Sequence, residues 1–311
     1  MRILVVGAGA IGGYYGSRLL QAGAQVSFLV RPKRAALLAS QGLRVSSELG
    51  DYDAPVQTVA HAALRPDYDL IVLGCKAYDL EAALHDLAPA MGSGAVILPL
   101  LNGLSVYDQL DARFGADHVL GGVAYIATML DRENVIQHFG RNDTLIVGPR
   151  SQAAAAVALA FKALIARTPG ERALSEDIDQ ALWNKWVMLA SGAMMNCLMR
   201  GTIGDILSTQ DGRRLMEQAM GECGSVAAAS DHRLSSEDVQ RLEARLLDPQ
   251  SNWAASMMRD IAQGAQRLEA DAIVGDMIRR AERHGLDVPL MRAAYCHLQV
   301  YEHQRAASVA V

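Results

Sequence analysis

The sequence begins Met1-Arg2-Ile3-Leu4-Val5-Val6-Gly7-Ala8-Gly9-Ala10-Ile11-Gly12, and this stretch decides the fold of its N-terminal half. The apolar run Arg2–Val6 predicts a buried strand, which leads directly into the pattern Gly-x-Gly-x-x-Gly. A helical pattern follows from Ile11 to Ala22 and ends at Gly23. A second apolar run at residues 25–30 completes one βαβ unit.

The glycines of this loop have a physical purpose. They permit a tight turn, they let a pyrophosphate approach the backbone, and they let the helix pack closely on the strand. The N–H groups and the dipole of the helix N-terminus then attract the pyrophosphate. We therefore predict a dinucleotide site, the alternative being a tight turn that holds no ligand. The predicted contacts are Gly7, Gly9, Ala10, Ile11 and Gly12.

The residue after the second strand predicts which dinucleotide binds. An Asp or Glu that accepts hydrogen bonds from the adenosine ribose is usual at this position, but here the residue is Arg31, with Lys33 and Arg34 close behind. Positive charge suits a 2′-phosphate and offers no acceptor to ribose hydroxyls. The sequence thus favours NADPH over NADH, with a solvated basic turn as the alternative.

Further strands and helices alternate through the first half of the chain. Runs at Leu70–Leu73 and Ala95–Leu98 predict strands, with a helix at Leu80–Met91 between them. Two more strands, Asn134–His138 and Thr144–Val147, are predicted on either side of a turn at residues 140–143, which would form an antiparallel edge. This order indicates a Rossmann-type α/β domain with a mostly parallel sheet.

After Pro149 the β-branched runs disappear, and Ala, Leu, Met and Arg recur at helical spacing. Ser151–Ala166 can still pack on the first domain as a last helix. We therefore predict an NADP-binding domain at residues 1–168 and an all-α substrate and catalytic domain at residues 169–311. Ser235 predicts a helix start, and Gly285 with Pro289 separates the last two helices.

Composition excludes several classes of function. The net charge of -5 provides no positive field for nucleic acid or an anionic membrane surface. The four cysteines and eight histidines lack metal-ligand spacing, so we expect no metal. No apolar run approaches the roughly 18 residues that a membrane span needs. We expect a cytoplasmic protein that acts on a small molecule, and a homodimer is left open.

Several polar residues lie where chemistry is expected. Lys76 and Asn102 follow predicted strands, at the carboxyl edge where open α/β sheets bind ligands. Lys76 can reach a cofactor phosphate or ribose, and Asn102 can bring its amide near the nicotinamide and the substrate. Lys185 is the candidate proton donor, because reduction of a carbonyl needs an acid for the developing alkoxide. Ser256 and Glu269 can supply a hydroxyl and a carboxylate, although each residue alone also fits an ordinary surface position.

Seven segments together resemble the ketopantoate reductase family along essentially the whole chain. They are the loop at residues 7–12, Arg31, Cys75-Lys76-Ala77-Tyr78, Asn102-Gly103-Leu104, Ala181-Leu182-Trp183-Asn184-Lys185-Trp186, Ser256-Met257-Met258-Arg259-Asp260, and Glu269-Ala270-Asp271-Ala272-Ile273-Val274-Gly275. The resemblance implies NADPH-dependent reduction of 2-dehydropantoate to pantoate on the route to pantothenate and coenzyme A. It also implies roles for four residues: Lys185 as general acid, Glu269 as the residue that anchors or polarises the substrate, Ser256 on the substrate carboxylate, and Asn102 between cofactor and substrate.

The sequence departs from the family pattern in two places. Family members follow the lysine with asparagines four and eight residues on, which help to hold the substrate hydroxyl, but here Leu189 and Ala193 stand there. Asn196 is a further candidate for substrate contact, about three turns beyond the lysine. The segment from Ser256 to Glu269 is one residue longer than in the family, which would rotate the glutamate by roughly 100° if the helix were continuous.

Two other functions remain open from sequence. One is a non-catalytic NADPH-binding regulator that keeps the fold. The other is a dehydrogenase of another small hydroxy acid, since a dinucleotide domain joined to a helical domain serves several such reactions. The combination of Lys185 with Glu269 favours an enzyme over a regulator.

Overall fold

The computed structural model describes residues 1–92 and 94–307, and the chain divides into two compact units. The first unit comprises Met1–Leu101 and Val106–Ala181, and the second comprises Asn102–Ser105 and Leu182–Val311. This division lies later than the predicted boundary at residue 168. The reason is β10 (Glu171–Leu174), which pairs in parallel with β9 (Val135–Pro149) and so keeps the following residues with the first unit.

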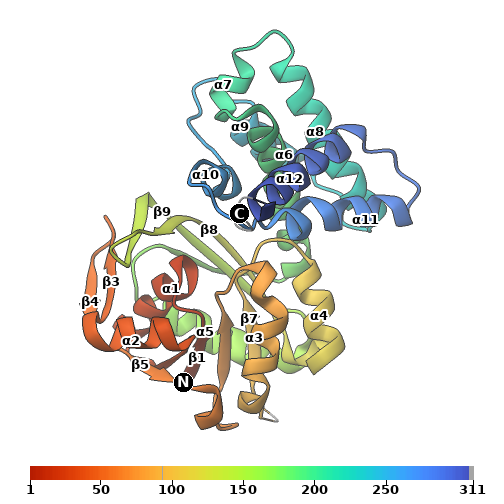
Figure 1. The fold of residues 1–311 in the computed structure, drawn as a ribbon. Coiled ribbons are helices and arrows are strands. Elements are labelled where there is room, and N and C mark those ends of the chain that lie inside the picture. Colours follow the sequence, from red (N-terminus) through yellow and green to blue (C-terminus); the bar gives the residue numbers. More distant parts are fainter. Residues whose placement is uncertain (93, 308–311) are drawn as a thin grey trace. The chain divides into compact units, whose positions relative to one another are not determined.

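A five-stranded parallel sheet with the order β5-β2-β1-β6-β7 forms the first part of this unit (Figure 1). Its strands are β1 (Arg2–Val6), β2 (Gln25–Leu29), β5 (Gln57–Val59), β6 (Leu70–Leu73) and β7 (Val96–Pro99). β6 and β7 are buried at every position, as expected for strands covered on both faces. The predicted parallel sheet is confirmed.

A second sheet has the order β10-β9-β3-β4, with β8 paired to β9. Its other strands are β3 (Leu43–Ser46), β4 (Tyr52–Ala54) and β8 (Leu120–Leu130). The prediction of two strands joined by a turn at residues 140–143 was wrong, because both segments belong to the single strand β9. The antiparallel partner is β8, and a register shift between Ile126 and Thr128 places residues 139–142 outside the regular pairing.

Helix α1 (Ala10–Gln21) packs between the two sheets, contacting β1 and β2 of one and β3, β8 and β9 of the other. Its glycines make this possible. A Cβ at Gly13 would lie 2.3 Å from Cδ1 of Ile136, and a Cβ at Gly16 would lie 2.5 Å from the Phe28 ring. The remaining helices of residues 1–181 are α2 (Pro32–Gln41), α3 (Leu80–Leu87), α4 (Ser105–Phe114) and α5 (Ala155–Ile165).

The first unit is also held by a buried ion pair. The Arg172 guanidinium donates to both Asp143 carboxylate oxygens, at 2.8 and 2.5 Å, and both side chains are almost fully buried. The hydroxyls of Tyr14 and Tyr15 on α1 donate to the same carboxylate at 2.8 and 3.0 Å. Asp143 therefore links α1, β9 and β10, and its negative charge helps to raise the pKa of Tyr14 to about 12, after the larger effect of burial.

The described residues of the second unit form helices joined by loops and contain no strand, which confirms the predicted all-α domain. Its helices are α6 (Ile178–Met199), which begins in the first unit, α7 (Ile203–Leu207), α8 (Gly212–Ala229), α9 (Ser236–Leu246), α10 (Ser256–Ala262), α11 (Asp276–Arg283) and α12 (Pro289–Ala307). Ser235 caps α9 as predicted, accepting a hydrogen bond from the Asp238 N–H at 3.1 Å. Within the described part of the chain, no helix combines the length and apolar character that would let it cross a bilayer.

We predict that Asp143→Ala destabilises the protein by about 3–5 kcal/mol, because it leaves the buried Arg172 guanidinium without its partner. Glu237→Ala, which breaks an exposed ion pair with Arg241 on α9, should change stability by less than about 1 kcal/mol. Urea denaturation followed by circular dichroism measures both. Equal losses of unfolding free energy in the two variants would show that the buried ion pair stabilises the protein no more than the exposed one.

Candidate active site

The glycine loop between β1 and α1 is shaped by one positive φ and by two close backbone approaches that leave no room for a side chain. Gly7 has a φ of +92°, and a Cβ at Gly12 would lie 2.1 Å from the Gly7 carbonyl oxygen. A Cβ at Gly74, just after β6, would lie 2.5 Å from the Gly12 Cα. A Cβ at Gly9 meets nothing within 4 Å, so the loop is open on that side. The first N–H groups of α1 have no side-chain cap, which is the arrangement that binds a pyrophosphate.

Arg34 supports the loop from α2. Its Nε donates to the Ala8 carbonyl at 3.1 Å and its Nη1 donates to Asn134 Oδ1 at 3.3 Å. Its Nη2 is buried without a hydrogen-bond partner, and burial lowers the pKa of the guanidinium. A buried donor beside the glycine loop fits an anionic ligand, because an unsatisfied charged donor is costly. These residues therefore fit a dinucleotide cofactor.

Arg31 and Lys76 lie in the same unit. Arg31 is the N-cap residue of α2, its side chain is 71% exposed, and its Nη2 lies 2.8 Å from Asp79 Oδ1. That contact raises the pKa of Arg31, so the guanidinium stays charged and open to an anion. Lys76 is half-buried in the extended segment after β6. Sequence reasoning missed Asp79 and the support from Arg34, since neither has a motif.

The second unit brings Asn102 and Lys185 together, although they are 83 residues apart in sequence. Lys185 on α6 donates from Nζ to Asn102 Oδ1 at 3.1 Å. Gly103 explains why Asn102 reaches this position, because a Cβ there would lie 2.3 Å from the Ala272 carbonyl oxygen, and its φ of +85° also requires glycine. The close contact between Gly103 and Ala272 thus fixes the position of Asn102.

Glu269 acts on Lys185 electrostatically. Burial lowers the pKa of Lys185 to about 8, and the negative charge of Glu269 opposes that shift. Glu269 itself is buried, with 6% of its surface exposed. A lysine whose pKa lies near neutrality can release a proton and take it back at physiological pH.

The predicted rotation of Glu269 does not arise, because the helix is not continuous. α10 ends at Ala262, and Gly264, with a φ of +74°, turns the chain before Glu269. Glu269 is followed by the helical residue Ala270 and then by the π-helical segment Asp271–Gly275, which leads into α11. The extra residue of this segment is therefore taken up in a connection that is not helical.

Both polar atoms of the Asn196 side-chain amide form hydrogen bonds with backbone groups. Its Nδ2 donates to the Gly201 carbonyl at 2.8 Å, and its Oδ1 accepts from the Ala255 N–H at 3.0 Å. It is fully buried, so we withdraw it as a substrate contact. Its partner Ala255 directly precedes Ser256, the half-buried first residue of α10. Asn196 thus holds the segment that carries Ser256.

The face of α6 that follows Lys185 is apolar. Leu189 and Ala193 lie one and two turns on, with 8% and 0% of their surfaces exposed. Neither side chain can accept or donate a hydrogen bond. The two positions where the family resemblance led us to expect amides therefore carry buried apolar side chains.

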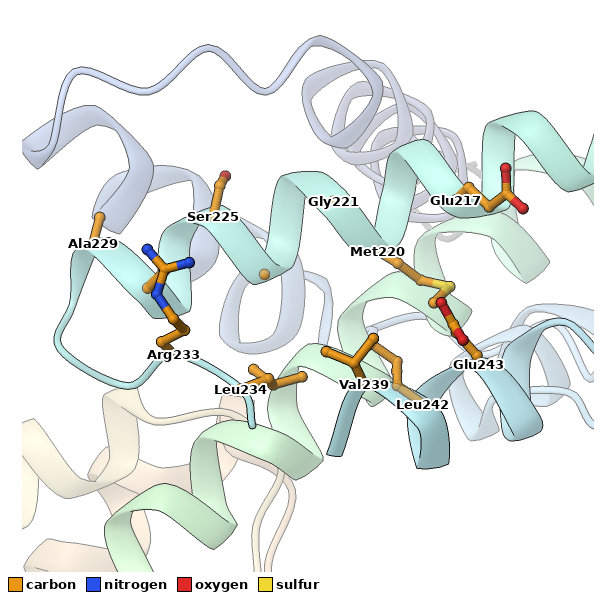
Figure 2. Close-up of a pocket in the computed structure, with 12 residues that line it drawn as sticks. Glu217, Met220, Gly221, Ser225, Ala229, Arg233, Leu234, Val239, Leu242 and Glu243 are labelled. Atoms are coloured by element: carbon orange, nitrogen blue, oxygen red, sulfur yellow. The ribbon is translucent and has the colours of Figure 1, made fainter. Parts of the chain in front are cut away.

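A pocket of about 690 Å³ lies elsewhere in the second unit, formed by α8, α9 and the segment between them (Figure 2). Its floor includes Met220, Leu234 and Leu242. None of the predicted cofactor or substrate residues lines it, so it has no part in the candidate site. In the described residues, no cluster of three or more His, Cys, Asp or Glu side chains is arranged to hold a metal ion.

Comparison with known proteins identifies the family. Residues 3–152 match the model described as ketopantoate reductase PanE/ApbA, and residues 177–302 match that of the C-terminal part of ketopantoate reductase PanE/ApbA. The chain belongs to the ketopantoate reductase family. This membership makes it an oxidoreductase that uses a nicotinamide cofactor and acts on a small 2-oxo acid.

The similarity to individual relatives covers almost the whole chain. The chain is 33% identical to the uncharacterized oxidoreductase YkpB of Bacillus subtilis, over 98% of this chain and 100% of that one. It is 29% identical to 2-dehydropantoate 2-reductase of Halobacterium salinarum, over 94% and 96% of the two chains.

Solved structures agree with this fold. A PanE/ApbA family ketopantoate reductase from Ralstonia eutropha is 26% identical with a TM-score of 0.86, over 98% of this chain and 100% of that chain. D-mandelate dehydrogenase, in its ternary structure with NADH and anilino(oxo)acetate, has a TM-score of 0.88 at 20% identity, over 98% and 99% of the two chains. The latter likeness is one of fold.

We predict that Glu269→Gln lowers the pKa of Lys185 below its value of about 8, because the variant removes the charge that favours the ammonium. NMR titration of 13C-labelled lysine side chains measures this pKa directly, with Lys185→Arg used to assign the signal. Glu243→Gln, at an exposed position on α9, is the matched control and should leave the titration unchanged. An unchanged or higher pKa in Glu269→Gln would contradict the inferred interaction.

Proposed function

We propose that this ketopantoate reductase family member reduces a small 2-oxo acid to the 2-hydroxy acid with NADPH, and that Lys185 is the proton donor. The observation that carries the proposal is the Lys185 ammonium, bound to Asn102 and influenced by Glu269, with a pKa of about 8. A non-catalytic regulator would gain nothing from a partly buried ammonium, whose desolvation is unfavourable. The chemistry of this cluster therefore favours catalysis.

Each residue of the cluster has a proposed task in the reaction. NADPH, when bound, supplies the hydride that C2 of the substrate receives. Lys185 donates a proton from Nζ to the C2 oxygen as negative charge develops there, and the resulting amine is reprotonated from solvent. Asn102 orients Nζ through its amide oxygen. Glu269 keeps the amine protonated, and Ser256 offers its hydroxyl to the substrate carboxylate.

The basic residues after β2 support NADPH as the cofactor. Arg31 presents an exposed guanidinium, and the buried Nη2 of Arg34 lies on a side chain already bound to the glycine loop. A 2′-phosphate would give Arg31 a second anionic partner besides Asp79. NADH has hydroxyls there and would leave this charge without a phosphate.

The substrate is 2-dehydropantoate or a related 2-oxo acid. The similarity to 2-dehydropantoate 2-reductase of Halobacterium salinarum supports the first, and the apolar side chains at Leu189 and Ala193 support a substrate without the terminal hydroxyl. A site that hydrogen-bonds a hydroxyl rejects analogues lacking it, whereas an apolar site discriminates weakly. With the amides absent, we favour the second class. The product of dehydropantoate reduction would serve pantothenate and coenzyme A synthesis.

We predict that Lys185→Ala lowers kcat by about 10²–10⁴-fold, the usual effect of removing a general acid. The affinity for NADPH should be unchanged, since the glycine loop and Arg31 belong to the other unit. Reduction by the native enzyme should fall above about pH 8, where the ammonium loses its proton. Absorbance assays measure turnover and its pH dependence, and fluorescence titration measures the affinity for NADPH. Lys162→Ala is the control variant. Near-normal turnover in Lys185→Ala would remove Lys185 from the mechanism.

We predict that Arg31→Asp reduces the preference for NADPH over NADH by about 2 kcal/mol, which is the usual scale of a charge-assisted hydrogen bond. Arg113→Asp is a suitable control, because Arg113 also pairs with one carboxylate, Glu81, in the same unit. Dissociation constants for both cofactors are measured with each variant. Equal affinities of the native protein for NADPH and NADH would show that Arg31 reads no phosphate.

We predict that kcat/KM for 2-oxoisovalerate equals or exceeds that for 2-dehydropantoate, because Leu189 and Ala193 stand where the family resemblance implies hydroxyl-holding asparagines, and neither side chain can form a hydrogen bond. The Leu189→Asn variant should shift the ratio toward 2-dehydropantoate. Steady-state kinetics with both substrates decide the matter. If native enzyme prefers 2-dehydropantoate by orders of magnitude, another residue binds the hydroxyl.

A further inference from the structure

Trp186 follows Lys185 in sequence and is almost completely buried, with 1% of its surface exposed. Its indole Nε1 donates a hydrogen bond to the Ile273 carbonyl at 3.0 Å. Ile273 lies in the π-helical segment Asp271–Gly275, and its own N–H donates to the Glu269 carbonyl at 3.0 Å. Ile273 therefore connects the backbone of Glu269 to the side chain of Trp186.

The same π-helical segment also contacts the third member of the cluster. Gly103 approaches the Ala272 carbonyl so closely that a Cβ would lie 2.3 Å from its oxygen. Asn102, which accepts the hydrogen bond from Lys185, is the residue before Gly103. Asn102, Lys185 and Glu269 are thus each tied, through their own backbone or an adjacent residue, to Ala272 or Ile273. π-Helical turns are rare and occur frequently at functional sites.

Trp186 is held in turn by Arg280 of α11. The Arg280 guanidinium lies 5.4 Å from the centre of the Trp186 ring and 5.6 Å from that of Trp183, and its Nε donates to the buried Asp276 at 3.0 Å. Arg280 lies near both tryptophan rings, but the hydrogen bond to the Ile273 carbonyl is formed by Trp186. The two tryptophans therefore provide a matched pair of similar burial and size.

We propose that Trp186 is a positioning residue, whose indole N–H holds the π-helical segment in place and so sets Glu269 and Asn102 against Lys185. Its side chain is almost completely buried and acts through the Ile273 peptide. This inference rests on the proposed roles of Lys185 and Glu269. Without the N–H, the segment loses its tie to α6, and the Glu269 charge moves away from the ammonium.

Trp186→Phe removes the N–H donor and retains an aromatic ring, and Trp183→Phe is its control. Trp186→Phe should lower the pKa of Lys185, in the same direction as Glu269→Gln, as measured by lysine NMR without any substrate. It should also lower kcat about tenfold, less than the roughly hundredfold loss from misplacement by a full ångström, with little change in KM. Trp183→Phe should change neither quantity.

A variant with 3-benzothienylalanine at position 186 keeps the shape of the indole and lacks the N–H, so it decides the matter if Trp186→Phe unfolds. The proposal is overturned if the pKa of Lys185 stays at its native value in the folded variant, or if both tryptophan variants behave alike. Failure of the proposed function is distinguishable, since Lys185→Ala would then retain turnover, or the native protein would reduce no 2-oxo acid. The NMR titration would still report the placement of Glu269.

Discussion

Desolvation of the Lys185 ammonium is the constraint around which the helical unit is arranged. Removing a cation from water is unfavourable, and it lowers the pKa of Lys185 to about 8. The negative charge of Glu269 opposes this shift, and Asn102 accepts a hydrogen bond from the amine. Both partners come from distant parts of the sequence, so they need a common support. The π-helical segment after Glu269 provides it.

The glycine loop of the first unit is open on one side, and its backbone fits an anion. Gly12 and Gly74 occupy positions where a side chain would collide with neighbouring backbone, and Gly7 has a φ of +92° that favours glycine. Two more glycines on α1, Gly13 and Gly16, let that helix pack between two sheets. The N-terminus of α1 is consequently fixed on both sides, and a fixed set of N–H groups binds a phosphate without further ordering.

Much of this arrangement could be predicted from sequence because it depends on local patterns. The glycine loop, the parallel strands and the cap at Ser235 each follow from residues within one turn or one strand. The strand β8 was missed because Gly121 and Gly122 weaken its pattern. Their reason is tertiary: a Cβ at Gly121 would lie 2.3 Å from the Ile178 side chain, and one at Gly122 would lie 2.7 Å from Leu98.

The finer details of the site depended on partners far away in the sequence. Asn196 appeared available for substrate until its bond to the Ala255 N–H, 59 residues on, was known. Arg34 was predicted only as part of a basic turn suited to a 2′-phosphate, and its hydrogen bonds to Ala8 and Asn134 were not predicted. The orientation of Glu269 relative to Ser256 could not be derived by counting residues along a helix, because the chain turns at Gly264. Side-chain roles of this kind are set by tertiary contacts, which sequence spacing does not contain.

Transfer of label from cofactor to substrate tests the central claim most directly. The native protein would be incubated with 2-oxoisovalerate and NADPH carrying deuterium at C4 of the nicotinamide, using each stereoisomer in turn. The product would then be analysed by NMR and mass spectrometry. We predict that one stereoisomer delivers deuterium to C2 of the 2-hydroxy acid and that the other delivers none. A 2-hydroxy acid without deuterium at C2 from either isomer, or no reduction of 2-oxoisovalerate and 2-dehydropantoate alike, would contradict the claim.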